Sequence, residues 1–152
     1  MHFPIAVLFL SFIVGYSTDY PTKTLDCNDP NGYGVVEVRE SNANYVKIVR
    51  GDKVFETIKL PTEIERNGFA VNWAKKTKAG FEISVEYGSR YYYEKRFNFI
   101  CKQHKFYLSK IIVTSFDKAD PEKWNTKVVR IKPNLPLEKF SINDFMLEGV
   151  VK

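Results

Sequence analysis

Between Phe81 and Tyr87 apolar and polar side chains alternate without a break. Phe, Ile, Val and Tyr occupy the odd positions, and Glu82, Ser84 and Glu86 stand between them. Successive side chains of a β-strand point to opposite faces of the sheet, so this segment predicts a strand with one buried and one wet face. Such a strand belongs to an antiparallel sheet that covers a core on one side only.

The next segment repeats the pattern after a turn at Gly88-Ser89. From Tyr91 to Cys101 most odd positions are aromatic, and Cys101 shares their parity. Tyr92 and Arg96 fall on the opposite, wet parity. The sequence therefore places Cys101 on the apolar face, which favours a buried structural cysteine over an exposed reactive thiol.

Short β-rich runs separated by turn residues fill the rest of the chain. The expected strands are 34–40, 43–50, 53–60, 69–74, 81–87, 91–101, 106–116 and 127–132. The connections are too short for parallel crossovers, so the chain predicts an all-β fold, an antiparallel meander of seven or eight strands that forms a small barrel or sandwich. An open curved sheet with the tail packed across it is the alternative.

Three segments modify this picture. Residues 106–116 are apolar on both parities, which predicts a central strand or one with a bulge. Asp120-Pro121 predicts a single helical turn. The tail, residues 133–152, is expected to be extended through Pro133 and Pro136, then to form a short helix over about 142–147 capped by Ser141, and to pack on the sheet.

The amino terminus predicts a compartment. Residues Phe3 to Tyr16 form an uncharged apolar run that is short for a bilayer-spanning helix, and Gly15 and Ser17 are the small residues that a signal peptidase requires. Residues 1–17 are thus predicted to be a signal peptide, and residues 18–152 one domain that is secreted or periplasmic and not integral to a membrane. An uncleaved anchor is the alternative, because no Lys or Arg precedes the run.

Cysteines and charge agree with that location. The chain has two cysteines, Cys27 and Cys101, and in an exported protein an even count predicts a disulfide. The net charge of +5 favours acidic partners: an acidic protein first, and anionic glycans or lipid headgroups next. Nucleic acid is not expected as a partner in this compartment.

The chemistry needed for catalysis is sparse. Once residues 1–17 are removed, His104 is the only histidine, so neither a metal site nor a catalytic triad is predicted, and no cofactor is expected. Glu82 and Glu86 would lie about 13 Å apart along one strand, too far for a hydrolytic carboxylate pair. A neighbouring carboxylate such as Glu94 would come closer, but charges on a wet sheet face are usually cross-strand pairs. The sequence predicts a protein that is not an enzyme.

Three features are candidate contact surfaces for a partner. They are the aromatic and basic strand around Tyr92, the basic loop 75–78 beside Trp73, and the loop that ends at Trp124, whose ring is expected to be buried. The candidate residues are Trp73, Lys75, Lys76, Lys78, Arg90, Tyr92, Arg96 and Trp124. The alternative for the strand around Tyr92 is ordinary strand patterning, and for the loop 75–78 it is a solvated charge run. For Trp124 the alternative is a buried ring that only anchors its loop.

A stiff disulfide-linked domain without catalytic groups suits a binding role. The sequence favours a non-catalytic binding protein, an inhibitor or immunity-type protein that blocks an acidic hydrolase or toxin. The alternative is a small-molecule or glycan-binding β-barrel module of the cell envelope, with Tyr91, Tyr93 and Phe99 lining its interior.

Overall fold

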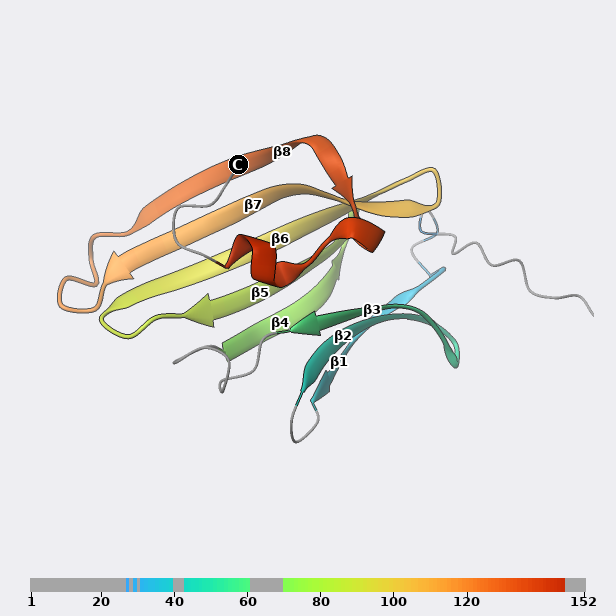
Figure 1. Cartoon of the computed structure of the whole chain (residues 1–152), viewed down its shortest axis with the longest axis horizontal. Coiled ribbons are helices and arrows are strands. Elements are labelled where there is room, and N and C mark those ends of the chain that lie inside the picture. Colours follow the sequence, from blue (N-terminus) through green and yellow to red (C-terminus); the bar gives the residue numbers. More distant parts are fainter. Residues whose placement is uncertain (1–26, 28, 30, 40–42, 61–69, 147–152) are drawn as a thin grey trace, which may run out of the picture.

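The computed structural model describes residues 27, 29, 31–39, 43–60 and 70–146, of which 70–72 by their backbone alone. The predicted signal peptide and its cleavage point lie outside these residues. Eight strands and two short 3-10 turns follow one another in the chain (Figure 1). The strands are β1 (Gly34–Arg39), β2 (Asn44–Arg50), β3 (Lys53–Leu60), β4 (Ala70–Thr77), β5 (Gly80–Tyr87), β6 (Tyr91–Lys102), β7 (Lys105–Asp117) and β8 (Asn125–Pro136).

The strands form two antiparallel sheets, β1-β2-β3 and β4-β5-β6-β7-β8, each in sequence order. The predicted all-β class and the meander of antiparallel neighbours are confirmed. Closure into a barrel is not supported, because the strand pairing of the described residues leaves β1 and β3 as the edges of one sheet and β4 and β8 as the edges of the other. The main-chain N–H of Ala74 in β4 bonds to the Glu37 side chain of β1, and no backbone ladder joins these two strands.

The two sheets share one hydrophobic core. Val46 and Ile48 of β2 enter it from the small sheet, and Phe81, Phe97 and Phe99 enter it from the large one. Phe81 stacks on Phe99 with ring centroids 4.4 Å apart. These odd positions of β5 and β6 are the ones that the alternating pattern predicts to be buried, so the core follows directly from the period of two.

β7 is a central strand between β6 and β8, and its register shifts between Leu108 and Lys110. Both expectations for residues 106–116, a central position and a bulge, are thus met. β8 is longer than the predicted 127–132 and carries Pro133 and Pro136 at its far end. A proline is tolerated there because β8 lies at the edge of the sheet.

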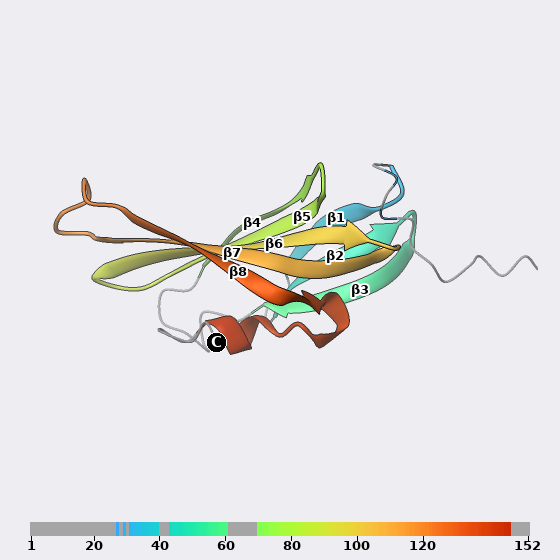
Figure 2. The same cartoon turned by 90° about the horizontal axis from the view of Figure 1, so that it is seen from above.

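The carboxy-terminal segment crosses one face of the large sheet (Figures 1 and 2). Leu137–Lys139 and Ile142–Phe145 are single 3-10 turns, shorter than the expected helix, and Ser141 makes no side-chain cap. Phe140 packs edge-on against Phe97 and Phe99, with centroids 5.5 and 5.0 Å away. The Lys95 ammonium donates to the Phe145 carbonyl, which satisfies a lysine that is buried on this face.

Two connections differ from the sequence-based prediction. β4 continues through Thr77, so Lys75 and Lys76 are strand residues and only Lys78 lies in the turn. The segment after Asp117 forms consecutive turns instead of a helical one. The Asp117 carboxylate accepts the Ala119 N–H at 2.9 Å. The Lys123 N–H donates to the Asp120 carbonyl at 3.2 Å, and the Asp120 carboxylate, expected to cap a helical turn, pairs instead with the Lys123 ammonium at 2.6 Å.

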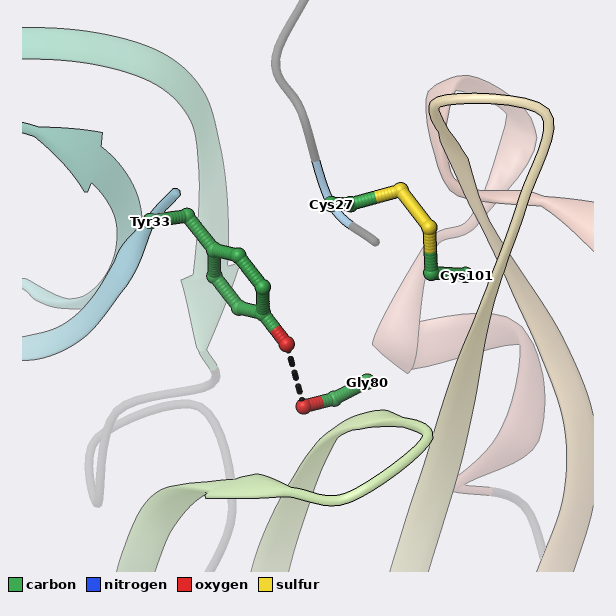
Figure 3. Close-up of a disulfide and its surroundings, with 4 residues drawn as sticks. All are labelled: Cys27, Tyr33, Gly80 and Cys101. Carbon is green, nitrogen blue, oxygen red and sulfur yellow. Dashed lines mark hydrogen bonds between the residues drawn. A yellow bond between two sulfur atoms is a disulfide. The ribbon is translucent and has the colours of Figure 1, made fainter. Parts of the chain in front are cut away.

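The predicted disulfide is confirmed. Cys27 and Cys101 are bonded, with Cα atoms 5.8 Å apart, and Cys27 is buried (Figure 3). Nearby, the Tyr33 hydroxyl donates to the Gly80 carbonyl at 2.6 Å, and burial raises the pKa of this phenol. Two anchors therefore hold the segment that precedes β1 against the large sheet. A structural disulfide is typical of proteins from oxidising compartments.

Candidate binding face

The large sheet has two unlike faces. Its inner face holds the core, the small sheet and the carboxy-terminal segment. The other, which we call the outer face, carries the even-numbered side chains of β5 and β6, those of β7 from Lys110 onward and those of β8 up to Arg130. Beyond the irregularity in β4, Trp73 and Lys75 also lie on it. The strand register arranges these side chains in rows across the sheet. Three of these rows run across β6, β7 and β8. They are Glu94-Thr114-Thr126, Arg96-Ile112-Val128 and Asn98-Lys110-Arg130.

An aromatic cluster of Tyr92, Phe116 and Trp124 lies at one end of the outer face. The Phe116 ring centroid is 4.7 Å from that of Tyr92 and 4.4 Å from that of Trp124. Trp124 is 59% exposed, so the expectation that it is buried is wrong. The β5–β6 and β7–β8 turns project beyond the small sheet and the carboxy-terminal segment, which cover only the inner face (Figures 1 and 2).

Cations gather at the other end of the outer face. Lys110 and Arg130 stand directly opposite each other in β7 and β8, and both are exposed. Neither forms an ion pair with any residue that the structure describes. Like charges directly opposite each other on a sheet destabilise it, and an external anion between them would relieve the repulsion.

Arg96 lies between the aromatic cluster and these cations. Its Nε atom is buried and finds no hydrogen-bond partner within the described part of the chain. A buried donor without a partner costs free energy, which an arriving acceptor would recover only where the guanidinium can turn toward it.

Two carboxylates of the outer face, Glu86 and Glu94, are engaged by their neighbours. Glu86 and Glu94 are opposite each other in β5 and β6. Ser84 Oγ donates to Glu94 Oε1 at 2.7 Å, and the Tyr92 hydroxyl donates to Glu86 Oε1. The second bond fixes the Tyr92 ring in the aromatic cluster. Glu94 thus comes near Glu86, as the sequence allows, in a pattern of ordinary cross-strand contacts.

The basic segment 75–78 does not form a single cluster. Lys75 lies on the outer face with its ammonium 4.0 Å from the Trp73 ring centroid, whereas Lys76 donates to the Tyr33 carbonyl at 2.8 Å on the inner side. Lys78 is exposed in the β4–β5 turn. The three lysines diverge because neighbouring side chains of a strand point to opposite faces.

Arg90 lies in the β5–β6 turn and forms an ion pair with Asp117 at 3.3 Å. The pKa of the Asp117 carboxyl is lowered, mainly by the hydrogen bond from the Ala119 amide and further by Arg90. The main-chain N–H of Lys118 also donates to the Arg90 carbonyl at 3.1 Å. Arg90 therefore joins two neighbouring turns. This structural role explains the residue without a contact to a partner protein.

Of the eight predicted site residues, Trp73, Lys75, Tyr92, Arg96 and Trp124 share the outer face. Sequence reasoning missed four others on the same face: Lys110, Ile112, Phe116 and Val128. Val128 is 54% exposed. Its exposure has a sequence signal, because Thr126, Val128 and Arg130 share a parity, but strand pairing is needed to bring them beside Tyr92 and Arg96.

No group of three or more potential metal ligands occurs among the residues described. Within the same ranges, no helix has the length and apolarity to cross a membrane. No protein-family model, curated protein or solved structure matches this chain.

Proposed function

We propose that this chain is a secreted or periplasmic non-catalytic binding protein, of the inhibitor or immunity type, that blocks an acidic partner protein through its outer face. The observation that carries the proposal is Trp124, which is 59% exposed in an aromatic cluster on the outer face. Trp, Tyr and Arg are the residues most enriched among the energetic centres of protein interfaces. Tyr92, Arg96 and Trp124 supply one of each on this face.

Charge supports an acidic partner. Lys110 and Arg130 lack carboxylate partners in the described structure, and the chain carries a net charge of +5. Complementary charge across an interface speeds association and selects partners more than it raises affinity. Binding is therefore expected to weaken as salt is added.

The disulfide supports the location. A bonded pair of cysteines persists in secreted and periplasmic proteins and is rare in the reducing cytosol. The apolar run at residues 3–16 adds a route of export.

Little in the structure favours the alternative, a module that holds a small ligand in its interior. Of the residues expected to line that interior, Phe99 is almost fully buried and Tyr93 packs against the core, whereas Tyr91 is 49% exposed. A hollow lined by Glu37, Arg39 and Tyr45 has a cavity volume of about 10 Å³, far below the ~300 Å³ at which ligand pockets begin.

The test compares two charge-reversed variants of the protein after a partner has been isolated and its binding curve measured. The variant Lys110→Glu with Arg130→Glu changes a cross-strand pair of cations on the outer face. The matched control, Lys102→Glu with Lys105→Glu, changes another exposed cross-strand pair, at the β6–β7 turn. We expect the first variant to lose about tenfold or more in affinity and the control to lose little. Equal affinity of the two variants, or a partner with a basic contact surface, would overturn the proposal.

A further inference from the structure

The free edge of β8 is a second feature of this end of the sheet. β8 pairs only with β7, and no described strand lies along its other side. From Asn125 to Arg130 its register with β7 is regular, and most of its side chains are exposed. The edge therefore presents a row of backbone N–H and C=O groups that are ready to pair with another extended chain.

This edge is strongly basic. Lys127, Arg130 and Lys132 lie on it, and no Asp or Glu occurs between Lys123 and Leu137. Lys123, just before the strand, is already paired with Asp120 at 2.6 Å. Lys127 points to the inner face of the sheet and Arg130 to the outer face. A chain lying along β8 would thus meet a cation on each of its two faces.

The charge argues against a second copy of this protein as the occupant. Antiparallel pairing of two β8 edges would bring Lys127, Arg130 and Lys132 of one copy close to the same three cations of the other. Like charges opposite each other destabilise such a pair, which is a common way of preventing self-association at sheet edges. An acidic chain would turn the same repulsion into attraction.

Apolar side chains define what else the chain must carry. Val128 and Trp124 are both exposed. Val128 lies on the outer face, and the row of Thr126 separates it from the end of the sheet where Trp124 lies. A strand added beside β8 would continue the rows of the outer face. It would place an apolar side chain next to Val128 and an acidic one near Arg130.

We propose that the edge of β8, residues 126–131, binds an extended acidic segment of the partner by strand addition. This inference rests on the proposed function and specifies how the partner docks. Backbone hydrogen bonds would supply affinity. The order of acidic and apolar side chains along the bound segment would supply specificity.

The probe is a synthetic peptide with blocked ends and the central sequence Val-Glu-Val-Val-Glu-Thr. Antiparallel to residues 126–131, it would place glutamates beside Lys127 and Arg130 and a valine beside Val128. Two further peptides carry N-methyl groups on one or the other set of alternate amides, which removes the donors of one edge. A fourth replaces glutamate by lysine. Binding is followed by nuclear magnetic resonance, which also measures hydrogen exchange of the amides in β8.

We expect the unmodified peptide to bind and to slow exchange of alternate amides between Thr126 and Ile131. At least one methylated peptide should bind about tenfold more weakly, as should the unmodified peptide to the variant Lys127→Glu with Arg130→Glu. The control variant Lys102→Glu with Lys105→Glu should bind like the wild type.

Three results would overturn strand addition: no binding of the acidic peptide at millimolar concentration, equal binding of the lysine peptide, or unchanged affinity of both methylated peptides. None of them touches the proposed function, which fails separately if the isolated partner ignores Lys110→Glu with Arg130→Glu.

Discussion

The disulfide gives the most sharply defined energetic prediction. Cys27 and Cys101 are 74 residues apart, and a cross-link of that span removes chain entropy from the unfolded state. The loop-closure relation gives about 4.5 kcal/mol of stabilisation at 25 °C. Small domains have a total unfolding free energy of about 5–15 kcal/mol, so reduction should remove a large part of the stability of this one.

The assay is equilibrium unfolding in urea, monitored by tryptophan fluorescence, for the oxidised and the reduced wild type. With a slope of about 2 kcal/mol per molar urea, the midpoint should fall by about 2 M. The variant Cys27→Ser with Cys101→Ser should fall at least as far, because it also places a hydroxyl where Cys27 is only 6% exposed. A difference of less than about 1 kcal/mol between the oxidised and reduced protein would refute the reasoning.

Three further predictions concern single residues. Tyr33→Phe leaves the Gly80 carbonyl without its buried donor and should cost about 1–2 kcal/mol in urea unfolding. The folded pKa of Tyr33 is raised above its unfolded value, so the phenol's contribution is present below pH 10 and is lost as the pH rises through the folded pKa. Unfolding measured from pH 8 to 11 should therefore show a shallower alkaline decline in the variant, and parallel declines would contradict this. Gly80→Ala would place a Cβ 2.3 Å from the Phe99 carbonyl oxygen and should cost about 2 kcal/mol or more by thermal unfolding, whereas an unchanged midpoint would show that the backbone can adjust. Trp124→Ala should change stability by less than about 1 kcal/mol because the ring is largely exposed, yet weaken partner binding about tenfold by calorimetry, and a loss of stability without a loss of affinity would assign the ring to the fold.

The fold class could be read from the sequence because its signal is local. The alternation in β5 and β6 fixes which side chains face the core, and the structure buries Phe81, Ile83, Phe97 and Phe99 accordingly. The disulfide was predictable for a similar reason, since Cys101 continues the buried parity of β6.

The division into two sheets was not predictable in the same way. Alternation says which face of a strand is buried but not where pairing along the meander stops. The described pairing stops after β3 and begins again at β4, and β1 meets β4 through a side chain instead of a ladder. Barrel closure depends on such long-range pairing, about which the period of two carries no information.

The candidate site was likewise predictable only where one strand alone decides the face of a residue. Tyr92 and Arg96 could be assigned to a wet face from their own strand. Phe116 and Lys110 of β7 could not be placed beside them, because the bulge near Leu108 decides which residues of β6 they face. The expected burial of Trp124 was wrong because large aromatic rings are usually buried, whereas this one lies in a turn that extends beyond every covering element.

The central claim, that a partner covers the outer face, is tested most directly by oxidative footprinting of side chains in the free protein and in the complex. Burial of the aromatic cluster predicts that oxidation of Trp124 and Tyr92 slows strongly on binding, while Tyr45 on the small sheet reacts as before. Protection of Tyr45 with unchanged oxidation of Trp124 and Tyr92 would contradict the account.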